Sequence, residues 1–158
     1  WRQYPTMSDA LQAGGMVWRG VAIWDKTEGA RPQMGAFRNQ VEYILWGSNG
    51  PFQGSAEVGC LPGVFRYSVK QVDKHHQTGK PTALMRDVVR ICPPGGLVLD
   101  PFAGSGTTGV AALLEGRRFV GLEITDAYHA IATARLEEAA AAMAGTHATT
   151  PLFGGAHG

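Results

Sequence analysis

The residues with the clearest chemical potential form one glycine-rich stretch, Asp100-Pro101-Phe102-Ala103-Gly104-Ser105-Gly106-Thr107-Thr108-Gly109. Glycines permit positive φ, let a ligand approach the backbone and expose amide groups at the start of a following helix. Gly104, Gly106 and Gly109 match the dinucleotide fingerprint, and Glu123 follows about 20 residues on, where a carboxylate can accept hydrogen bonds from ribose hydroxyls. The pattern predicts a site for an adenosine-containing ligand.

Glycine turns also close strands for purely structural reasons, so the neighbouring elements must decide between the two interpretations. A nicotinamide enzyme needs several strands after the fingerprint, whereas only one strand and one helix are expected here. A phosphate-binding loop of the NTPase kind has Lys followed by Ser or Thr after its last glycine, and this loop has Thr107-Thr108 instead. The sheet must therefore be completed by strands that precede the loop.

The hydrophobic pattern along the chain predicts an α/β fold. Residues 16–24 and 41–46 are expected to form an antiparallel hairpin around a long loop, and residues 47–79 are expected to be irregular with at most one short strand. The rest of the chain has the pattern of a strand, a glycine turn, a helix, a second strand and a second helix. This order predicts that the two strands pair in parallel. We expect a mostly parallel sheet with strands at 97–99 and 119–124 and helices at 5–13, 82–91, 107–115 and 126–143.

Length and composition favour one domain. The chain has 158 residues of which 44% are apolar, and we expect a single domain over 1–143 and a disordered tail over 144–158. No apolar run approaches the roughly 18 to 20 residues of a membrane helix, so we expect a soluble, cytoplasmic protein. Cys60 and Cys92 lack metal-ligand spacing, and His75 and His76 have no third ligand nearby in the sequence, so no metal is expected.

The charges divide unevenly along the chain. Residues 1–90 carry eleven Lys and Arg against seven acids, whereas residues 91–158 carry three against six. A basic half beside an acidic half fits a surface for a polyanion next to a small-molecule site, although charges this small are also ordinary surface variation.

Three segments, taken together, resemble the amino-methylating DNA methyltransferases. The stretch from Asp100 to Thr108 resembles the cofactor-binding motif of that family, and His76-Gln77-Thr78-Gly79-Lys80-Pro81 resembles its His-x-Thr-x-Lys-Pro segment. Residues 37–46, Phe-Arg-Asn-Gln-Val-Glu-Tyr-Ile-Leu-Trp, resemble its region around a strand beside the target base. The segments occur in the family's order.

The resemblance implies a Rossmann-like fold with S-adenosylmethionine as cofactor and a role for each matching residue. Glu123 should hold the ribose, and Thr78 and Lys80 should meet the carboxylate of the cofactor. The alternatives are that Lys80 is a solvated charge and Glu123 an ordinary residue at a strand end. The residues expected to line the cofactor are Asp100, Phe102, Ala103, Gly104, Ser105 and Gly106.

The same resemblance implies contacts with double-stranded DNA. Phe37 should stack on the flipped base, with core packing as the alternative, because stacking on an aromatic ring is worth about 1–3 kcal/mol per base. Arg31 and Arg38 in the same loop should meet phosphates, with solvated surface as the alternative.

The family's catalytic element, an Asp-, Ser- or Asn-Pro-Pro followed by an aromatic residue, is absent from this sequence. Cys92-Pro93-Pro94-Gly95 lacks both the polar first residue and the aromatic. We therefore expect no catalytic residue in this chain and place the motif, with the central strands, upstream of Trp1. A cytosine-C5 enzyme is disfavoured, because it needs a cysteine after Pro-Pro and a cofactor loop near the amino terminus.

The implied activity is methyl transfer from S-adenosylmethionine to the exocyclic amino group of adenine or cytosine in DNA, with this chain inactive by itself. Its expected partners are DNA and either a second copy of itself or a complementary amino-terminal half, with no membrane partner. Two alternatives stay open: a methyltransferase acting on RNA or a small molecule, and a non-catalytic half-domain that binds cofactor or a partner polypeptide.

Overall fold

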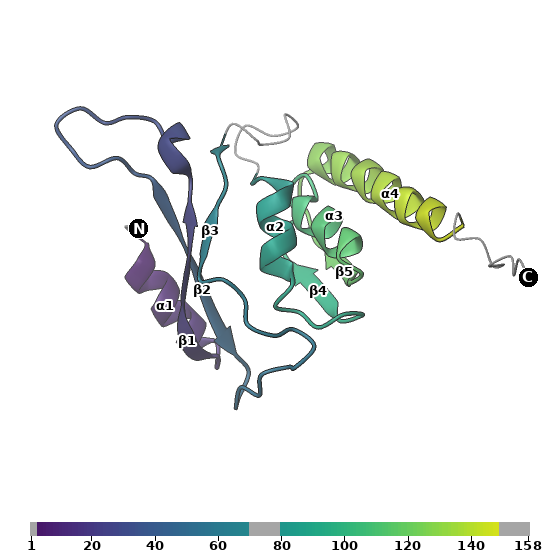
Figure 1. Ribbon diagram of the computed structural model, residues 1–158, viewed down its shortest axis with the longest axis horizontal. Coiled ribbons are helices and arrows are strands. Elements are labelled where there is room, and N and C mark those ends of the chain that lie inside the picture. Colours follow the sequence, from purple (N-terminus) through teal and green to yellow (C-terminus); the bar gives the residue numbers. More distant parts are fainter. Residues whose placement is uncertain (1–2, 70–79, 149–158) are drawn as a thin grey trace, which may run out of the picture.

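The strands of the chain form two separate sheets. In the computed structural model, which describes residues 3–69 and 80–148, the first sheet has the order β2-β1-β3 and the second pairs β4 with β5 (Figure 1). The strand bounds are β1 Val17–Asp25, β2 Val41–Ser48, β3 Val64–Arg66, β4 Leu97–Asp100 and β5 Arg118–Gly121.

The expected antiparallel hairpin is confirmed. β1 and β2 pair from Val17 opposite Ser48 to Asp25 opposite Val41, with one irregularity between Trp18 and Gly20. Their Val, Ile, Trp and Tyr residues suit a pleated, half-buried surface. The short strand anticipated within 47–79 is β3, which runs parallel to β1 and places Phe65 beside Trp24.

The helices lie close to their expected positions. They are α1 Tyr4–Ala13, α2 Thr82–Val89, α3 Thr107–Leu114 and α4 Asp126–Ala148, with a short 3-10 turn, η1, at Thr27–Gly29. The alanine-rich α4 continues past the boundary expected at Met143 and ends at Ala148, so that residues 144–148 of the expected tail are helical. The remainder of the expected tail, 149–158, lies outside the described residues.

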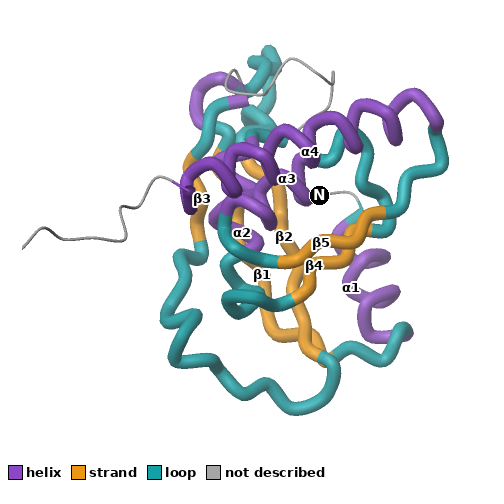
Figure 2. Tube along the Cα trace, turned by 90° about the vertical axis from the view of Figure 1, so that its right-hand side faces the viewer, coloured by secondary structure: helices purple, strands orange, loops and turns teal. Residues whose placement is uncertain are grey.

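The core lies where α2 packs on the first sheet. Trp24, Phe65 and Leu84 form one buried cluster, and the Trp24 indole N–H donates to the Tyr67 carbonyl oxygen at 2.8 Å. In Figure 1, α1 lies on one side of β1 and β2 and α2 lies on the other. The Arg86–Glu115 ion pair, at 2.7 Å, joins α2 to the end of α3. Figure 2 shows α3 and α4 together over β4 and β5.

A cleft of about 920 Å³ reaches from the edge of β2 toward the end of β4. Its walls are mostly apolar and come from α1, β2 and α2, with Pro101 and Phe102 following β4. Within 3–69 and 80–148, the outer edge of β2 has no strand partner, and β4 pairs on one side only. Leu97 and Leu99 of β4 are correspondingly exposed. The parallel pairs β1–β3 and β4–β5 therefore stand apart instead of forming one continuous sheet.

Candidate functional site

The glycine-rich loop begins where β4 ends, and hydrogen bonds hold its first residues to one another and to the segment after β5. The Asp100 carboxylate accepts a hydrogen bond from the Phe102 amide at 3.0 Å, which braces the first turn of the loop. The Leu122 amide donates to the Asp100 carbonyl oxygen, and the Ala103 amide donates to the Leu122 carbonyl oxygen, both at 2.9 Å. The β4–β5 ladder thus continues past both strands and carries the loop to the segment that contains Glu123.

Glu123 ties the loop to the segment after β5. One carboxylate oxygen accepts from the Gly104 amide at 2.8 Å, and the other accepts from the Thr125 amide at 2.9 Å. The pKa of Glu123 lies below its ordinary value, mainly because the Thr125 backbone amide binds the carboxylate. The Thr125 side chain and the Gly104 amide lower the pKa further, and together these bonds outweigh the increase that burial causes. An ionised carboxylate only accepts hydrogen bonds, so this side chain suits donors such as amides and hydroxyl groups.

The start of α3 has a conformation that requires glycine. Gly106 caps the helix at φ 79°, and a Cβ at this position would lie 3.0 Å from the Ala132 Cβ of α4. α4 therefore packs directly against the loop, which only a residue without a side chain permits. The first amides of α3 have no partner within the helix, as at every helix start, and suit an electronegative ligand group.

Arg135 of α4 holds the middle of the loop, and sequence reasoning missed it. Its Nη1 donates to the Ser105 carbonyl oxygen at 2.6 Å and to the Ser105 and Thr107 hydroxyls at 3.2 Å each. Ser105, which we expected to line the cofactor, is buried and turned toward this guanidinium. Arg135 is the one basic Lys or Arg in α4, but no spacing rule connects it with residues 28 to 30 positions away.

Two large apolar side chains flank the loop with their surfaces open. Phe102 is 88% exposed and Ile124 is 98% exposed. An apolar wall beside a hydrogen-bonding carboxylate and free helix amides is the composition of a small-molecule site. Among the described residues, no group of three His, Cys, Asp or Glu side chains is arranged to hold a metal ion.

The other predicted site residues lie outside this loop. Lys80 is exposed and lines the cleft beside α2, whereas Thr78 falls outside the described residues. Phe37, Arg31 and Arg38 lie together in the loop between β1 and β2. Phe37 is almost fully exposed, so core packing is wrong for this side chain.

The chain is similar to known DNA methylases over much of its length. Residues 61–134 match the family described as DNA methylase. The Escherichia coli (strain K12) protein YubD, named as a methylase, is 31% identical over 144 residues, or 90% of this chain and 61% of YubD. The DNA adenine methyltransferase YhdJ of the same strain is 43% identical over 75 residues, or 47% of this chain and 25% of YhdJ.

Solved structures share the fold. The M1.HpyAVI–SAM complex superposes with a TM-score of 0.69 at 28% identity, covering 86% of this chain and 70% of that one. The cytosine-N4-specific PvuII DNA methyltransferase has a TM-score of 0.67 at 19% identity, over 84% of this chain and 56% of that one, and this likeness concerns the fold alone.

The fold is therefore the Rossmann-like fold of S-adenosylmethionine-dependent methyltransferases. The chain resembles the amino-methylating DNA methyltransferases. It spans 61% of the length of YubD and 25% of YhdJ. No helix among the described residues is both long enough and apolar enough to cross a bilayer.

Replacing Arg135 should loosen the loop without unfolding the chain. Arg135→Ala leaves the buried Ser105 hydroxyl and carbonyl without this donor, which costs about 1–3 kcal/mol. We expect faster amide hydrogen exchange over residues 104–108 and a lower melting temperature, whereas Glu138→Ala on the exposed face of the same helix should change neither. Unchanged exchange over 104–108 in Arg135→Ala would show that the guanidinium does not fix the loop.

Proposed function

We propose that this chain provides the cofactor-binding part of a DNA methyltransferase, which transfers a methyl group from S-adenosylmethionine to the exocyclic amino group of adenine or cytosine in the cytoplasm. The observation that carries the proposal is the bond between the Glu123 carboxylate and the Gly104 amide at the carboxyl ends of two parallel strands. Open α/β sheets bind their ligands at that edge. The names of YubD and YhdJ and the SAM complex of M1.HpyAVI support the same activity.

In this proposal the residues around the loop bind and orient the cofactor. Glu123 accepts hydrogen bonds from the ribose hydroxyls, and the exposed Phe102 ring packs against the adenosine part. Asp100 keeps the loop open by binding the Phe102 amide. Lys80, together with Thr78, binds the carboxylate of the methionine part. Ala103, Gly104, Ser105 and Gly106 form the backbone of the cradle.

The cofactor supplies an electrophilic methyl group on its sulfonium, and the acceptor nitrogen must be brought in line with it. A base inside a duplex cannot present its amino group in this way and has to be flipped out. Phe37 is proposed to stack on the flipped base, and Arg31 and Arg38 to meet the phosphates that flank it.

The cleft between β2 and β4 is proposed to receive polypeptide from outside these 158 residues. The relatives are longer, the cleft walls are mostly apolar, and an unpaired strand edge tends to pair with another strand. The proposed occupant is an amino-terminal half whose strands pair with both edges and whose polar motif orients the target nitrogen. Since Lys80 and Phe102 line this cleft, the occupant would lie next to the cofactor loop.

Cofactor binding provides the test. S-adenosylhomocysteine should bind the chain in a calorimetric titration, and Glu123→Gln should weaken it by about ten- to a hundredfold, because hydrogen bonds to charged groups are worth about 1.5–3 kcal/mol. Glu137→Gln, an equally small change on the exposed face of α4, is the matched control and should bind like the unsubstituted chain. If the unsubstituted chain does not bind S-adenosylhomocysteine, the proposed function is wrong.

The chain by itself should not methylate DNA. A cofactor held without a group that positions the acceptor nitrogen gains little rate, because alignment of the reacting atoms provides much of the acceleration. The measurement is transfer of a labelled methyl group from S-adenosylmethionine to mixed-sequence duplex DNA by purified chain of verified mass. Turnover above a no-protein control would mean that the catalytic group lies within these 158 residues.

A further inference from the structure

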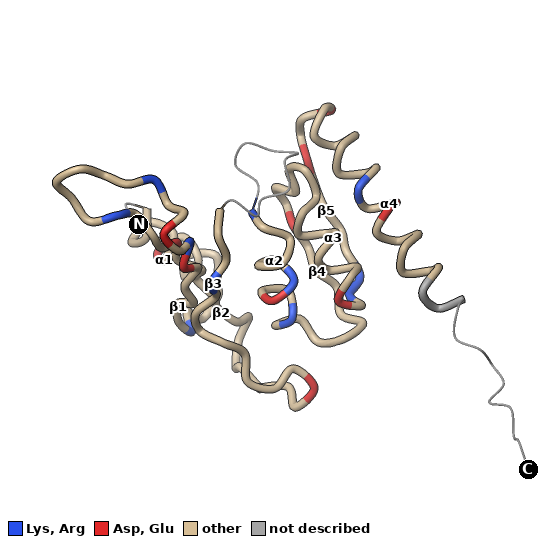
Figure 3. Tube along the Cα trace, turned by 45° about the horizontal axis from the view of Figure 1, so that its top comes forward, with Lys and Arg blue, Asp and Glu red and all other residues tan. Residues whose placement is uncertain are grey.

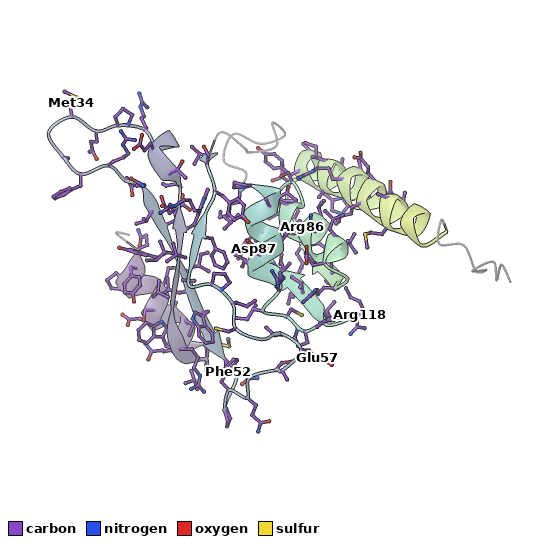
Figure 4. The ribbon with its side chains drawn as sticks, viewed as in Figure 1. Met34, Phe52, Glu57, Arg86, Asp87 and Arg118 are labelled. Carbon is purple, nitrogen blue, oxygen red and sulfur yellow. The ribbon has the colours of Figure 1, made fainter. Side chains whose placement is uncertain are left out.

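The loop between β1 and β2, residues 26–40, ends in an unusual tip. We define the tip as residues 31–38. Its two large apolar side chains, Met34 and Phe37, are 96% and 97% exposed. Figure 4 shows Met34 at the outer end of the loop, away from the sheet. Because such exposure leaves apolar surface in water without any intramolecular contact, the tip has the character of a binding element.

The neck of the same loop is firmly held. The Asp25 carboxylate accepts from the Thr27 amide at 2.8 Å, from the Gln40 side chain at 2.9 Å and from the Arg66 guanidinium at 3.0 Å. It thereby joins the end of β1 to the start of β2 and the end of β3. The Lys26 amide also donates to the Gln40 carbonyl oxygen at 2.8 Å. A fixed neck below an exposed tip presents the tip in a defined direction.

The charges around the tip indicate the chemistry of its partner. Lys26 in the neck is paired with Glu42 at 3.4 Å. Arg31 and Arg38, both exposed, stand at the two ends of the tip, and Figure 3 shows basic residues on both arms of the loop. Arg38 donates to the Glu28 carbonyl oxygen at 2.6 Å. This acceptor is uncharged, so the bond does not neutralise the guanidinium. The tip therefore carries two cations without an acidic partner among its own residues.

An apolar side chain between two arginines fits nucleic acid better than a protein surface. Proteins that open or bend a duplex insert Met, Leu, Ile or Phe between base steps, while arginines meet phosphates nearby. A methionine is unbranched and flexible, so it can fill an irregular gap between bases. A neutral protein partner would leave both guanidinium groups without counter-charges.

We propose that the tip is a wedge that inserts Met34 into the base stack of double-stranded DNA, with Arg31 and Arg38 against the flanking phosphates. This inference rests on the proposed function, since it takes DNA as the substrate. It separates two roles within the tip: Met34 occupies the gap in the stack, and Phe37 receives the extruded base. Inserting Met34 would also offset part of the stacking that is lost when a base leaves the helix.

The test compares two fluorescent duplexes of the same mixed sequence, one fully paired and one with a central abasic site. A wedge must first unstack the paired duplex, whereas the abasic site offers a gap already open. The unsubstituted chain should bind the abasic duplex about tenfold more tightly, and Met34→Ala should bind the two duplexes about equally. Gln33→Ala, an exposed neighbour in the same tip, is the matched control and should keep the preference.

Arg31→Ala separates charge from insertion. It should weaken binding to both duplexes alike and reduce the slope of log affinity against log salt by about one, because one phosphate contact is lost. The wedge is overturned if Met34→Ala keeps the preference for the abasic duplex, or if the unsubstituted chain has no such preference. A change of sedimentation in Met34→Ala with unchanged DNA binding would overturn it too, by making the tip a protein contact. Binding of S-adenosylhomocysteine, measured on the same samples, reports separately on the proposed function.

Discussion

The hydrogen bond from the Gly104 amide to the Glu123 carboxylate is the contact on which the rest of the site depends. It forms because β4 and β5 pair in parallel register, with Asp100 opposite Gly121, so that both strands end at one edge. α3 then starts at Gly106 directly beside α4, and Arg135 of α4 reaches back to the loop. A shift of the β4–β5 register by one residue would move the segment that carries Glu123 relative to Gly104 and break this hydrogen bond.

The separation of the strands into two sheets is a second constraint on the fold. It leaves unpaired strand edges and apolar side chains exposed between the sheets. The cleft from β2 to the residues after β4 has apolar walls, and Leu99 of β4 is 61% exposed. Exposed strand edges tend to pair with other chains, which natural proteins usually prevent. The cofactor cradle, the open cleft and the projecting loop are three separate surfaces, and the partners proposed for them are the cofactor, a complementary half and DNA.

Much of this arrangement could be predicted from the sequence, because the signals are local. Glycine positions, alternating apolar residues and the loop after 97–99 indicated the hairpin, the parallel pair and the pairing of the glycine loop with Glu123. What could not be predicted depends on distant contacts. β3 is three residues long and finds its place only by pairing with β1, and Arg135 reaches Ser105 across 30 positions. The exposure of Phe37 was equally undecidable, since an aromatic beside a strand suits core and surface alike.

The central claim is that the loop after β4 and the segment around Glu123 form one cofactor cradle, and amide hydrogen exchange with and without S-adenosylhomocysteine tests it most directly. We expect slower exchange on ligand addition in two separate segments, residues 102–107 and 122–125, with no change over residues 31–37. Protection confined to other parts of the chain, or in only one of the two segments, would contradict it, because a cradle shared by both strand ends must respond at both.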